Sequence, residues 1–170
     1  MNELSLRRAG PDDCEAIRGV LLTTWLATYA AFVPEADLRG YFASAYSPGA
    51  LTARMAMPGV QITLAEKGGS CVGVMITTPE PGEDRLAVNS LYVLPEVQGR
   101  GIGARLLGEA EARARREQLH ALWLGVMKQN VRSVEWYRRA GFRFDREEPF
   151  LMGKTSIMHL LGSRPVRPEA

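Results

Sequence analysis

A glycine-rich stretch, Gln98–Gly103, carries the clearest chemical signal in this chain of 170 residues. It follows the apolar run Leu91–Leu94 and Pro95, which ends that predicted strand, and it precedes a long helical pattern. Backbone N–H groups in the first turn of a helix lack partners within the helix and lie at the positive end of its dipole. Glycines at such a place let a bulky anion approach closely. We therefore expect this glycine turn, Gln98–Gly103, to bind phosphate.

Two other phosphate-binding motifs fit the glycine turn less well. Gly99, Gly101 and Ala104 match the dinucleotide-binding pattern, but that motif needs a strand leading directly into the turn and an acidic residue about 20 positions later. Here Pro95–Val97 intervene, and the next predicted strand, Ala121–Met127, has no acid. A P-loop is excluded because no Lys-Ser/Thr follows the last glycine. The alternative is that the glycine turn is a flexible surface turn that binds nothing. Closely spaced glycines would then only add to the conformational entropy lost on folding.

The glycine turn resembles the Q/R-x-x-G-x-G/A signature of the GNAT (GCN5-related N-acetyltransferase) family, in which the bound anion is the pyrophosphate of acetyl-CoA. Asn130 and the run Trp136–Phe142 are similar to a second element of that family, N-x-x-A-x-x-x-Y-x-x-x-G-F, with Val134 at the usual small residue. The resemblance implies acetyl-CoA as cosubstrate and no metal. It also implies a cofactor site made of Leu91, Val93, Gln98, Gly99, Arg100, Gly101, Ile102, Gly103, Ala104, Asn130 and Tyr137.

By the same resemblance, acetyl-CoA lies where the sheet splits, between the strand ending at Leu94 and the strand ending at Met127. The backbone of Val93 would bind the pantetheine arm and the thioester carbonyl, Asn130 would hold the arm or the pyrophosphate, and Tyr137 would point at the sulfur. An amine then attacks the thioester directly, through a tetrahedral intermediate. A backbone N–H stabilises the oxyanion and a phenol protonates the departing thiolate, so Val93 and Tyr137 are the expected catalytic groups.

The flanking segments resemble a narrower group, the PaiA-like spermidine/spermine N-acetyltransferases. The similar segments are Thr24–Tyr29, Trp123–Val126, and Phe150–Gly153 before Ile157-Met158. An acidic residue commonly precedes the terminal Ile/Leu-Met in that group, whereas Ser156 stands here. The resemblance implies a polyamine or other small primary amine as acceptor. Trp25 and Tyr29 would bind it, since aromatic rings suit alkyl-ammonium groups; the structural alternative is that both rings only pack on the sheet.

Two other functions stay open at the level of sequence. The acceptor could be the N-terminal α-amine of a protein, or the chain could be a non-catalytic acyl-CoA-binding sensor, because no proton acceptor is evident. Asn89 and Ser90 occupy the strand before the glycine turn, where many relatives carry a carboxylate. Proton removal would then run through water, or through Glu35 or Asp37 on the helical arm. His159, in the last predicted strand, is interpreted as structural.

Alternating and helical patterns place these residues in an α/β fold. Strands are expected near 4–7, 62–66, 71–77, 87–94, 121–127, 142–146 and 156–161, and helices near 12–32, 34–43, 48–57, 101–118 and 131–140. With the resemblance, this order predicts a GNAT-type mixed, mostly antiparallel sheet with a central parallel pair splayed apart and helices on both faces. Residues 1–162 would form one N-acetyltransferase domain, and residues 163–170 a disordered tail.

Composition narrows the expected partners and location. The formal net charge of +2 is too small to imply nucleic acid as a partner. No run is long and apolar enough to predict a membrane span, and the first residues lack the apolar core of a signal peptide. We therefore expect a cytoplasmic protein that meets a small-molecule or peptide amine, with a homodimer left open.

The arginine-rich helical segment Arg105–Arg116 is interpreted as a solvated face. Glu109 and Glu111 are spaced to pair with Arg113 and Arg115, four residues further on. A second interpretation is that some of these arginines contact the phosphates of CoA.

Overall fold

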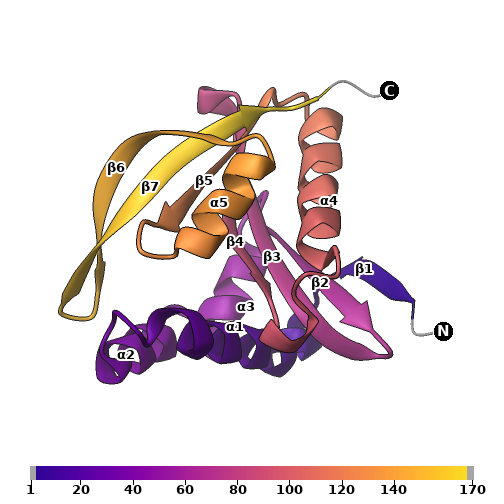
Figure 1. Cartoon of the computed structure of the whole chain (residues 1–170). Coiled ribbons are helices and arrows are strands. Elements are labelled where there is room, and N and C mark those ends of the chain that lie inside the picture. Colours follow the sequence, from indigo (N-terminus) through magenta and orange to yellow (C-terminus); the bar gives the residue numbers. More distant parts are fainter. Residues whose placement is uncertain (1–2, 168–170) are drawn as a thin grey trace.

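The computed structural model describes residues 3–167 and shows one sheet of seven strands (Figure 1). The strands run in the order β1-β2-β3-β4-β5-β7-β6, and only β4 and β5 are parallel. Their bounds are β1 (Leu4–Arg8), β2 (Gln61–Lys67), β3 (Ser70–Glu80), β4 (Arg85–Val93), β5 (Ala121–Met127), β6 (Arg143–Met152) and β7 (Thr155–Pro165). The expected mixed sheet with one central parallel pair is confirmed.

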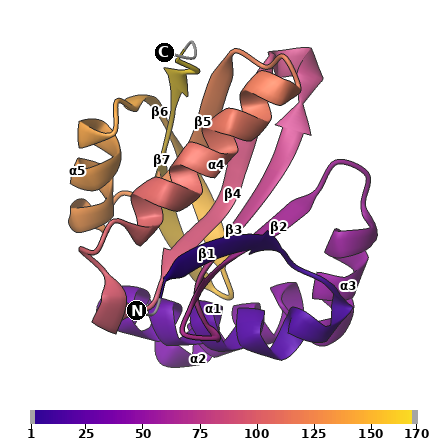
Figure 2. The same cartoon turned by 90° about the vertical axis from the view of Figure 1, so that its right-hand side faces the viewer.

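Helices cover both faces of the sheet (Figures 1 and 2). One layer consists of α1 (Cys14–Tyr29), α2 (Glu35–Ala45) and α3 (Pro48–Ala56), and the opposite layer of α4 (Ile102–Arg116) and α5 (Val131–Arg139). Short 3-10 turns lie at Pro11–Asp13, Pro81–Glu83 and Pro95–Val97. Side chains that alternate along β4 and β5 therefore face one helical layer or the other.

Each helical layer buries its own apolar core against the sheet. The buried stripe of α4 has the helical spacing expected from its sequence and consists of Ile102, Leu106, Ala110 and Ala114. The corresponding stripe of α1 consists of Ile17, Leu21 and Trp25. Because both helices are fixed by these contacts, the residues at their ends are held in place beside the centre of the sheet.

The central parallel pair splits soon after it forms. β4 and β5 pair only where Arg85–Ala87 lies beside Ala121–Trp123, and the later residues of the two strands diverge. On the other side of β4, the N–H of Leu94 donates to the carbonyl of Val72 in β3 (2.9 Å). Backbone groups of consecutive residues in a ladder point to opposite sides. The backbone of Val93 therefore points away from β3, toward the opening between β4 and β5.

The described end of the chain is part of the sheet, so the expectation of a disordered tail was wrong for residues 163–167. β7 continues to Pro165, and Arg164 is only 5% exposed. Glu111 of α4 accepts hydrogen bonds from the Arg164 guanidinium (2.9 Å) and from the backbone N–H of Arg167 (2.8 Å). This ion pair holds the segment against α4. Residues 168–170 lie outside the described part of the chain.

The expected solvated face of α4 is confirmed only in part: Arg105 and Arg116 are exposed, but two of the charged side chains are not. Glu111 and Arg113 are buried, with exposures of 3% and 6%. Arg113 donates to the hydroxyl of Thr77 in β3 (2.8 Å), and Glu109 pairs with Arg116 (3.0 Å) rather than with Arg113. The predicted pairs four residues apart were therefore wrong, because Glu111 and Arg113 reach neighbouring strands instead of solvent.

Within residues 3–167, no helix has the length and apolar character needed to cross a membrane. In the same range, no group of three His, Cys, Asp or Glu side chains gathers where a metal ion could be held. The free cysteines Cys14, on α1, and Cys71, on β3, are each half-buried.

Candidate active site

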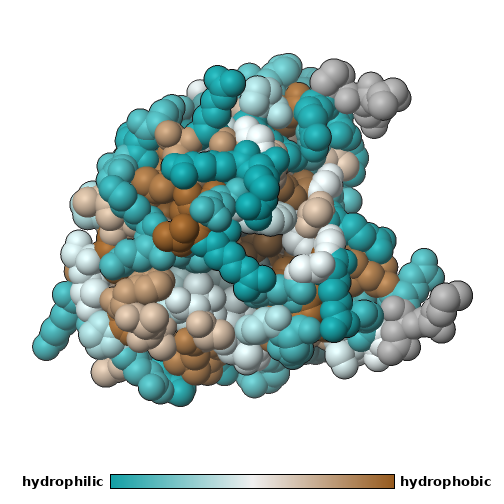
Figure 3. Space-filling model, viewed as in Figure 1, coloured by the Kyte–Doolittle hydropathy of each residue, from teal (hydrophilic) through white to brown (hydrophobic). Residues whose placement is uncertain are grey.

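A cavity of about 770 Å³ is lined by the diverging parts of β4 and β5. The glycine turn and α5 line one part of it, and α1, α2, β6 and β7 line the other. Figure 3, seen from the same side as Figure 1, shows a hollow near the middle of this face with apolar residues inside and hydrophilic residues around it. The split in the sheet therefore opens a continuous space between the two helical layers.

The glycine turn adopts a backbone that only glycine takes easily. Gly99 and Gly101 have φ angles of +77° and +79°, and added Cβ atoms would point into open space. A Cβ on Gly103 would lie 3.3 Å from the ring of Trp136. Gly101 caps α4 without any side-chain hydrogen bond, so the first N–H groups of this helix stay available. The turn is also anchored to β4, since the Gln98 amide donates to the carbonyl of Val93 (2.9 Å).

The structure brings almost all of the sequence-predicted site residues to this cavity. The residues that line it are Trp25, Tyr29, Leu91, Val93, Gln98, Gly99, Gly101, Ile102, Gly103, Ala104, Asn130 and Tyr137. Arg100 is the exception: it is exposed and lies outside the lining. The arginines of α4 are likewise outside it.

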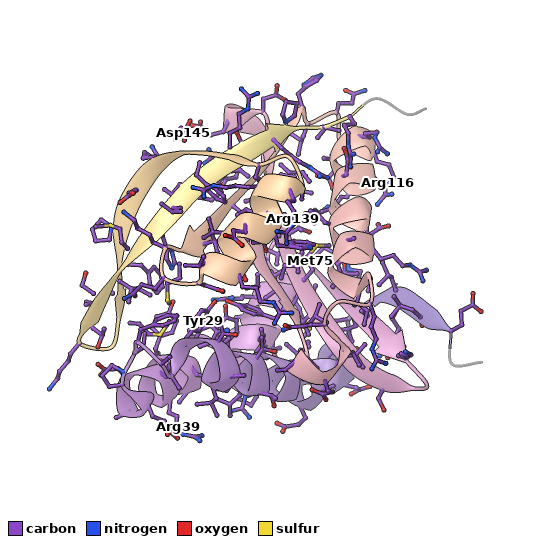
Figure 4. The ribbon with its side chains drawn as sticks, viewed as in Figure 1. Tyr29, Arg39, Met75, Arg116, Arg139 and Asp145 are labelled. Atoms are coloured by element: carbon purple, nitrogen blue, oxygen red, sulfur yellow. The ribbon has the colours of Figure 1, made fainter. Side chains whose placement is uncertain are left out.

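Sequence reasoning missed two arginines beside the glycine turn. Asn130 caps α5 by accepting a hydrogen bond from the N–H of Ser133 (3.3 Å), as an asparagine at a helix start commonly does. Arg132, in the first turn of α5, and Arg139, at its end, both line the cavity. Figure 4 shows Arg139 on α5, on the side that faces α4. Both arginines lie on the helix that begins at Asn130, and this position in the sequence could have indicated them.

Tyr137 places a protonated phenol in the wall of the cavity. Its side chain is 8% exposed and packs on Trp136 (4.9 Å between ring centres) and Phe142 (5.6 Å). Burial, and secondarily the neighbouring Tyr29, raise the pKa of Tyr137 above its usual value. The hydroxyl therefore keeps its proton throughout the neutral range and can donate it.

Aromatic side chains of α1, α2, β4 and β6 form an aromatic chamber at the other end of the cavity. Its members are Trp25, Tyr29, Tyr41, Tyr46, Tyr92 and Phe150. Trp25 lies at the centre and packs within 6.2 Å, between ring centres, of four of the other rings. Two hydroxyl contacts fix the chamber to β4: Tyr29 to Tyr92 (3.1 Å) and Tyr46 to Ser90 (3.2 Å). Trp25 and Tyr29 thus pack on the sheet and line the cavity as well.

The carboxylates expected near the reacting amine are elsewhere. Glu35 pairs with Arg39 (2.6 Å), and Asp37 accepts a hydrogen bond from Thr155 (2.7 Å). Neither lines the cavity, and no other Asp or Glu among residues 3–167 does. The imidazole of His159, on β7, does line the cavity, and it stacks on Phe150 (4.7 Å between ring centres). Burial lowers the pKa of His159, so its imidazole is neutral at pH 7.

Comparison with known proteins agrees with this geometry. The model of the Acetyltransferase (GNAT) family matches residues 25–142, which include the glycine turn and Tyr137. The chain belongs to this family. As a GNAT acetyltransferase it is an acyltransferase enzyme, and the family signature coincides with the wall of its cavity.

Curated relatives match this acetyltransferase over most of its length or over part of it. An uncharacterized N-acetyltransferase of Mycobacterium tuberculosis is 29% identical over 143 residues, which cover 83% of this chain and 90% of that protein. Streptothricin acetyltransferase of Streptomyces lavendulae is 33% identical over 76 residues, which cover 45% of this chain and 40% of that protein.

The solved structures that resemble this acetyltransferase share its fold. PaiA N-acetyltransferase of Thermoplasma acidophilum, crystallised in complex with coenzyme A, has a TM-score of 0.84 and 19% identity, covering 96% of this chain and 99% of that chain. Nourseothricin acetyltransferase has a TM-score of 0.71 and 21% identity, covering 96% of this chain and 99% of that chain. The splayed GNAT sheet is therefore common to these proteins at low sequence identity.

Proposed function

We propose that this protein transfers the acetyl group of acetyl-CoA to the primary amine of a small molecule held in the aromatic chamber. One observation carries this proposal: the glycine turn, Tyr137 and the aromatic chamber line a single cavity in the split of the sheet. A donor site and an acceptor site therefore meet at the backbone of Val93.

The glycine turn suits the pyrophosphate of acetyl-CoA. Its positive φ angles leave the approach to the α4 N-terminus open, and the free N–H groups there favour an anion. Arg132 and Arg139 add positive charge on the α5 side of the same cavity. Asn130 and the backbone of Leu91 and Val93 would hold the pantetheine arm, as the family resemblance implies.

Acetyl-CoA supplies a thioester. The amine nitrogen attacks its carbonyl carbon and forms a new C–N bond, and the C–S bond to CoA breaks. The N–H of Val93 is directed at the opening and would stabilise the negative charge that develops on the carbonyl oxygen, a contribution of roughly 3 kcal/mol for one such donor in comparable sites. Tyr137 would give its phenolic proton to the departing sulfur. This chain would therefore supply both groups that act on the thioester.

His159 is the side chain we propose for removing the amine proton. It lines the cavity, and burial keeps its imidazole neutral and able to accept a proton. Glu35 and Asp37, the candidates from sequence, are held by other partners outside the cavity. A water molecule between the amine and the imidazole would extend its reach.

Release of free thiol from acetyl-CoA, measured with a panel of acceptors, tests the proposal. The panel contains amino acids, spermidine, simple alkylamines and a peptide with a free N-terminus. Thiol release that depends on one of the small amines supports it. Binding of acetyl-CoA without any release would point to an acyl-CoA sensor, and release with the peptide alone would point to an N-terminal α-amine acetyltransferase.

A further inference from the structure

We infer that the acceptor amine carries a carboxylate, and that Arg54 of α3 binds this carboxylate in the aromatic chamber. The inference rests on the proposed function and names the chemical class of its acceptor. It depends on the charge of the cavity wall, on the contacts of Arg54, and on an indole N–H without an acceptor.

The charged residues that line the cavity are all arginines: Arg54, Arg132 and Arg139. Arg132 and Arg139 belong to α5, beside the glycine turn, where the phosphates of acetyl-CoA would lie. Arg54 belongs to the opposite helical layer, at the end of α3. Its positive charge is therefore on the acceptor side of the split, where the cofactor phosphates do not neutralise it.

Arg54 is held against the chamber and keeps its hydrogen-bonding capacity. Its guanidinium lies over the ring of Tyr46, 4.7 Å from the ring centre, and the side chain is half-buried. Within residues 3–167 it forms no ion pair, whereas Arg18, which lies over Phe42 on the same helical layer, pairs with Glu15 (3.4 Å). Stacking fixes the plane of the guanidinium, and its planar fork of N–H groups matches the two oxygens of a carboxylate.

A second donor in the chamber also lacks a partner. Trp25 is 3% exposed, lines the cavity, and its Nε1–H has no acceptor among the described residues. Buried N–H groups are rarely left without an acceptor. Trp25 and Arg54 both contact Tyr46, so the residues that carry the two unused donors share one neighbour in the chamber. Donors without acceptors favour a ligand rich in oxygen over one rich in ammonium groups.

This charge pattern argues against a polyamine. After one amine is placed at the thioester, the remaining ammonium groups of a polyamine would lie in a cavity whose described wall offers arginines and no carboxylate. Aromatic faces attract cations, but the guanidinium of Arg54 already covers Tyr46. A molecule with a single amine and a carboxylate instead places each charge against a group of the opposite sign or a neutral base.

Binding of matched acetylated products, one with and one without a carboxylate, tests the inference. Calorimetry of the CoA-loaded protein compares N-acetylphenylalanine with N-acetylphenylethylamine, which differ only in the carboxylate, and adds N-acetylspermidine. We expect the carboxylate-bearing product to bind at least about tenfold more tightly than either of the others, as for a hydrogen-bonded charge pair. Arg54→Gln should remove this preference, and Arg54→Lys should retain part of it. Arg39→Gln is the control, because Arg39 is exposed on the outer side of α2 (Figure 4) and outside the cavity lining.

The outcomes separate this inference from the proposed function. Equal binding of the two matched products, tighter binding of N-acetylspermidine, or an unchanged preference in Arg54→Gln overturns the role of Arg54 and the acceptor class. The thiol-release panel reports independently on whether acetyl transfer occurs. Amine-dependent release together with equal product binding would therefore leave the proposed function standing and the inference refuted.

Discussion

At the scale of single residues, the phenol of Tyr137 carries the clearest expected effect. Tyr137→Phe removes one hydroxyl and keeps the ring that packs on Trp136 and Phe142. Because the buried phenol is protonated and would donate its proton to the leaving sulfur, kcat should fall by about 100-fold. The KM for acetyl-CoA should change little, since the lost interaction matters mainly in the transition state. Steady-state kinetics measure both, and an unaltered kcat with chemistry rate-limiting would make Tyr137 a core residue.

His159 is tested by the dependence of the rate on pH. Burial lowers its pKa below the ordinary value of about 6.5, so the imidazole is neutral, and able to take a proton, at every pH above that. With an acceptor amine of pKa about 10, the wild-type rate should be nearly flat from about pH 7 to about pH 9 and fall as acid protonates the imidazole. In His159→Gln the rate should instead rise with pH, because only the neutral fraction of the amine reacts.

A wild-type rate that already rises about tenfold per pH unit over this range would contradict the role of His159. Proton transfer to bulk water would then be the route. The comparison requires a saturating acceptor and a measured chemical step, so that the profile reports on proton removal rather than on product release.

The sequence indicated the cavity residues that are close together along the chain better than those that come from distant elements. The glycine turn, Asn130 and Tyr137 lie within one continuous βαβα segment, where local spacing determines which groups meet. Arg54 and His159, in contrast, come to the cavity from α3 and β7, and no local pattern connects them. For the same reason Glu35 and Asp37 were plausible on the helical arm, although tertiary contacts with Arg39 and Thr155 hold them elsewhere.

At the scale of elements, the junction between the glycine turn and α4 should determine cofactor binding. In Gly101→Asp, a side chain is forced onto a residue with φ of +79°, and its charge lies where the pyrophosphate would bind. Calorimetry with CoA should show no measurable affinity in a protein that still unfolds cooperatively. Gly108→Asp, an exposed position further along the same helix with open space around it, should bind CoA as the wild type does. Unchanged CoA affinity in folded Gly101→Asp would refute the phosphate site.

Elements with strong periodicity were predicted closely, and elements with exposed or mixed faces were not. β5 was expected at 121–127 and is observed at Ala121–Met127, because its apolar run is bounded on both sides by polar residues. β6 was expected to end near residue 146 but continues to Met152. Most of its later residues, including Glu147 and Glu148, are exposed, so no apolar alternation marked them as strand. Pairing with β7, which sequence alone does not show, extends this strand.

At the scale of the whole molecule, the ion pair between α4 and the end of β7 should contribute strongly to stability. Glu111→Gln leaves the Arg164 guanidinium, 6% exposed, without its counter-charge. Removing one partner of a buried pair costs about 3–5 kcal/mol, which urea unfolding should detect as a reduced free energy of unfolding. Glu109→Gln is the control, since the exposed pair with Arg116 contributes about 1 kcal/mol or less. Equal effects of the two substitutions would show that the buried pair is not stabilising.

The same ion pair predicts a pH dependence of stability. Burial opposes ionisation of Glu111, but hydrogen bonds from Arg167 and the charges of Arg164 and Arg167 outweigh it and lower the pKa of this carboxyl. A lowered pKa in the folded state gives stability that is present above the unfolded value of about 4.3 and is lost as the pH falls through the folded value. The difference in unfolding free energy between wild type and Glu111→Gln should therefore shrink below about pH 4. A difference that is constant across this range would rule out an ionic contribution.

The most direct test of the account is to follow an isotope-labelled acetyl group from acetyl-CoA to the acceptor. The purified protein, labelled acetyl-CoA and the amine identified by thiol release are incubated, and mass spectrometry quantifies the labelled amide while a thiol reagent quantifies free CoA. The account predicts one labelled N-acetyl product for each thiol released. Thiol release with the label recovered as acetate, or no transfer from acetyl-CoA that the protein binds, would contradict the claim that this cavity acetylates an amine.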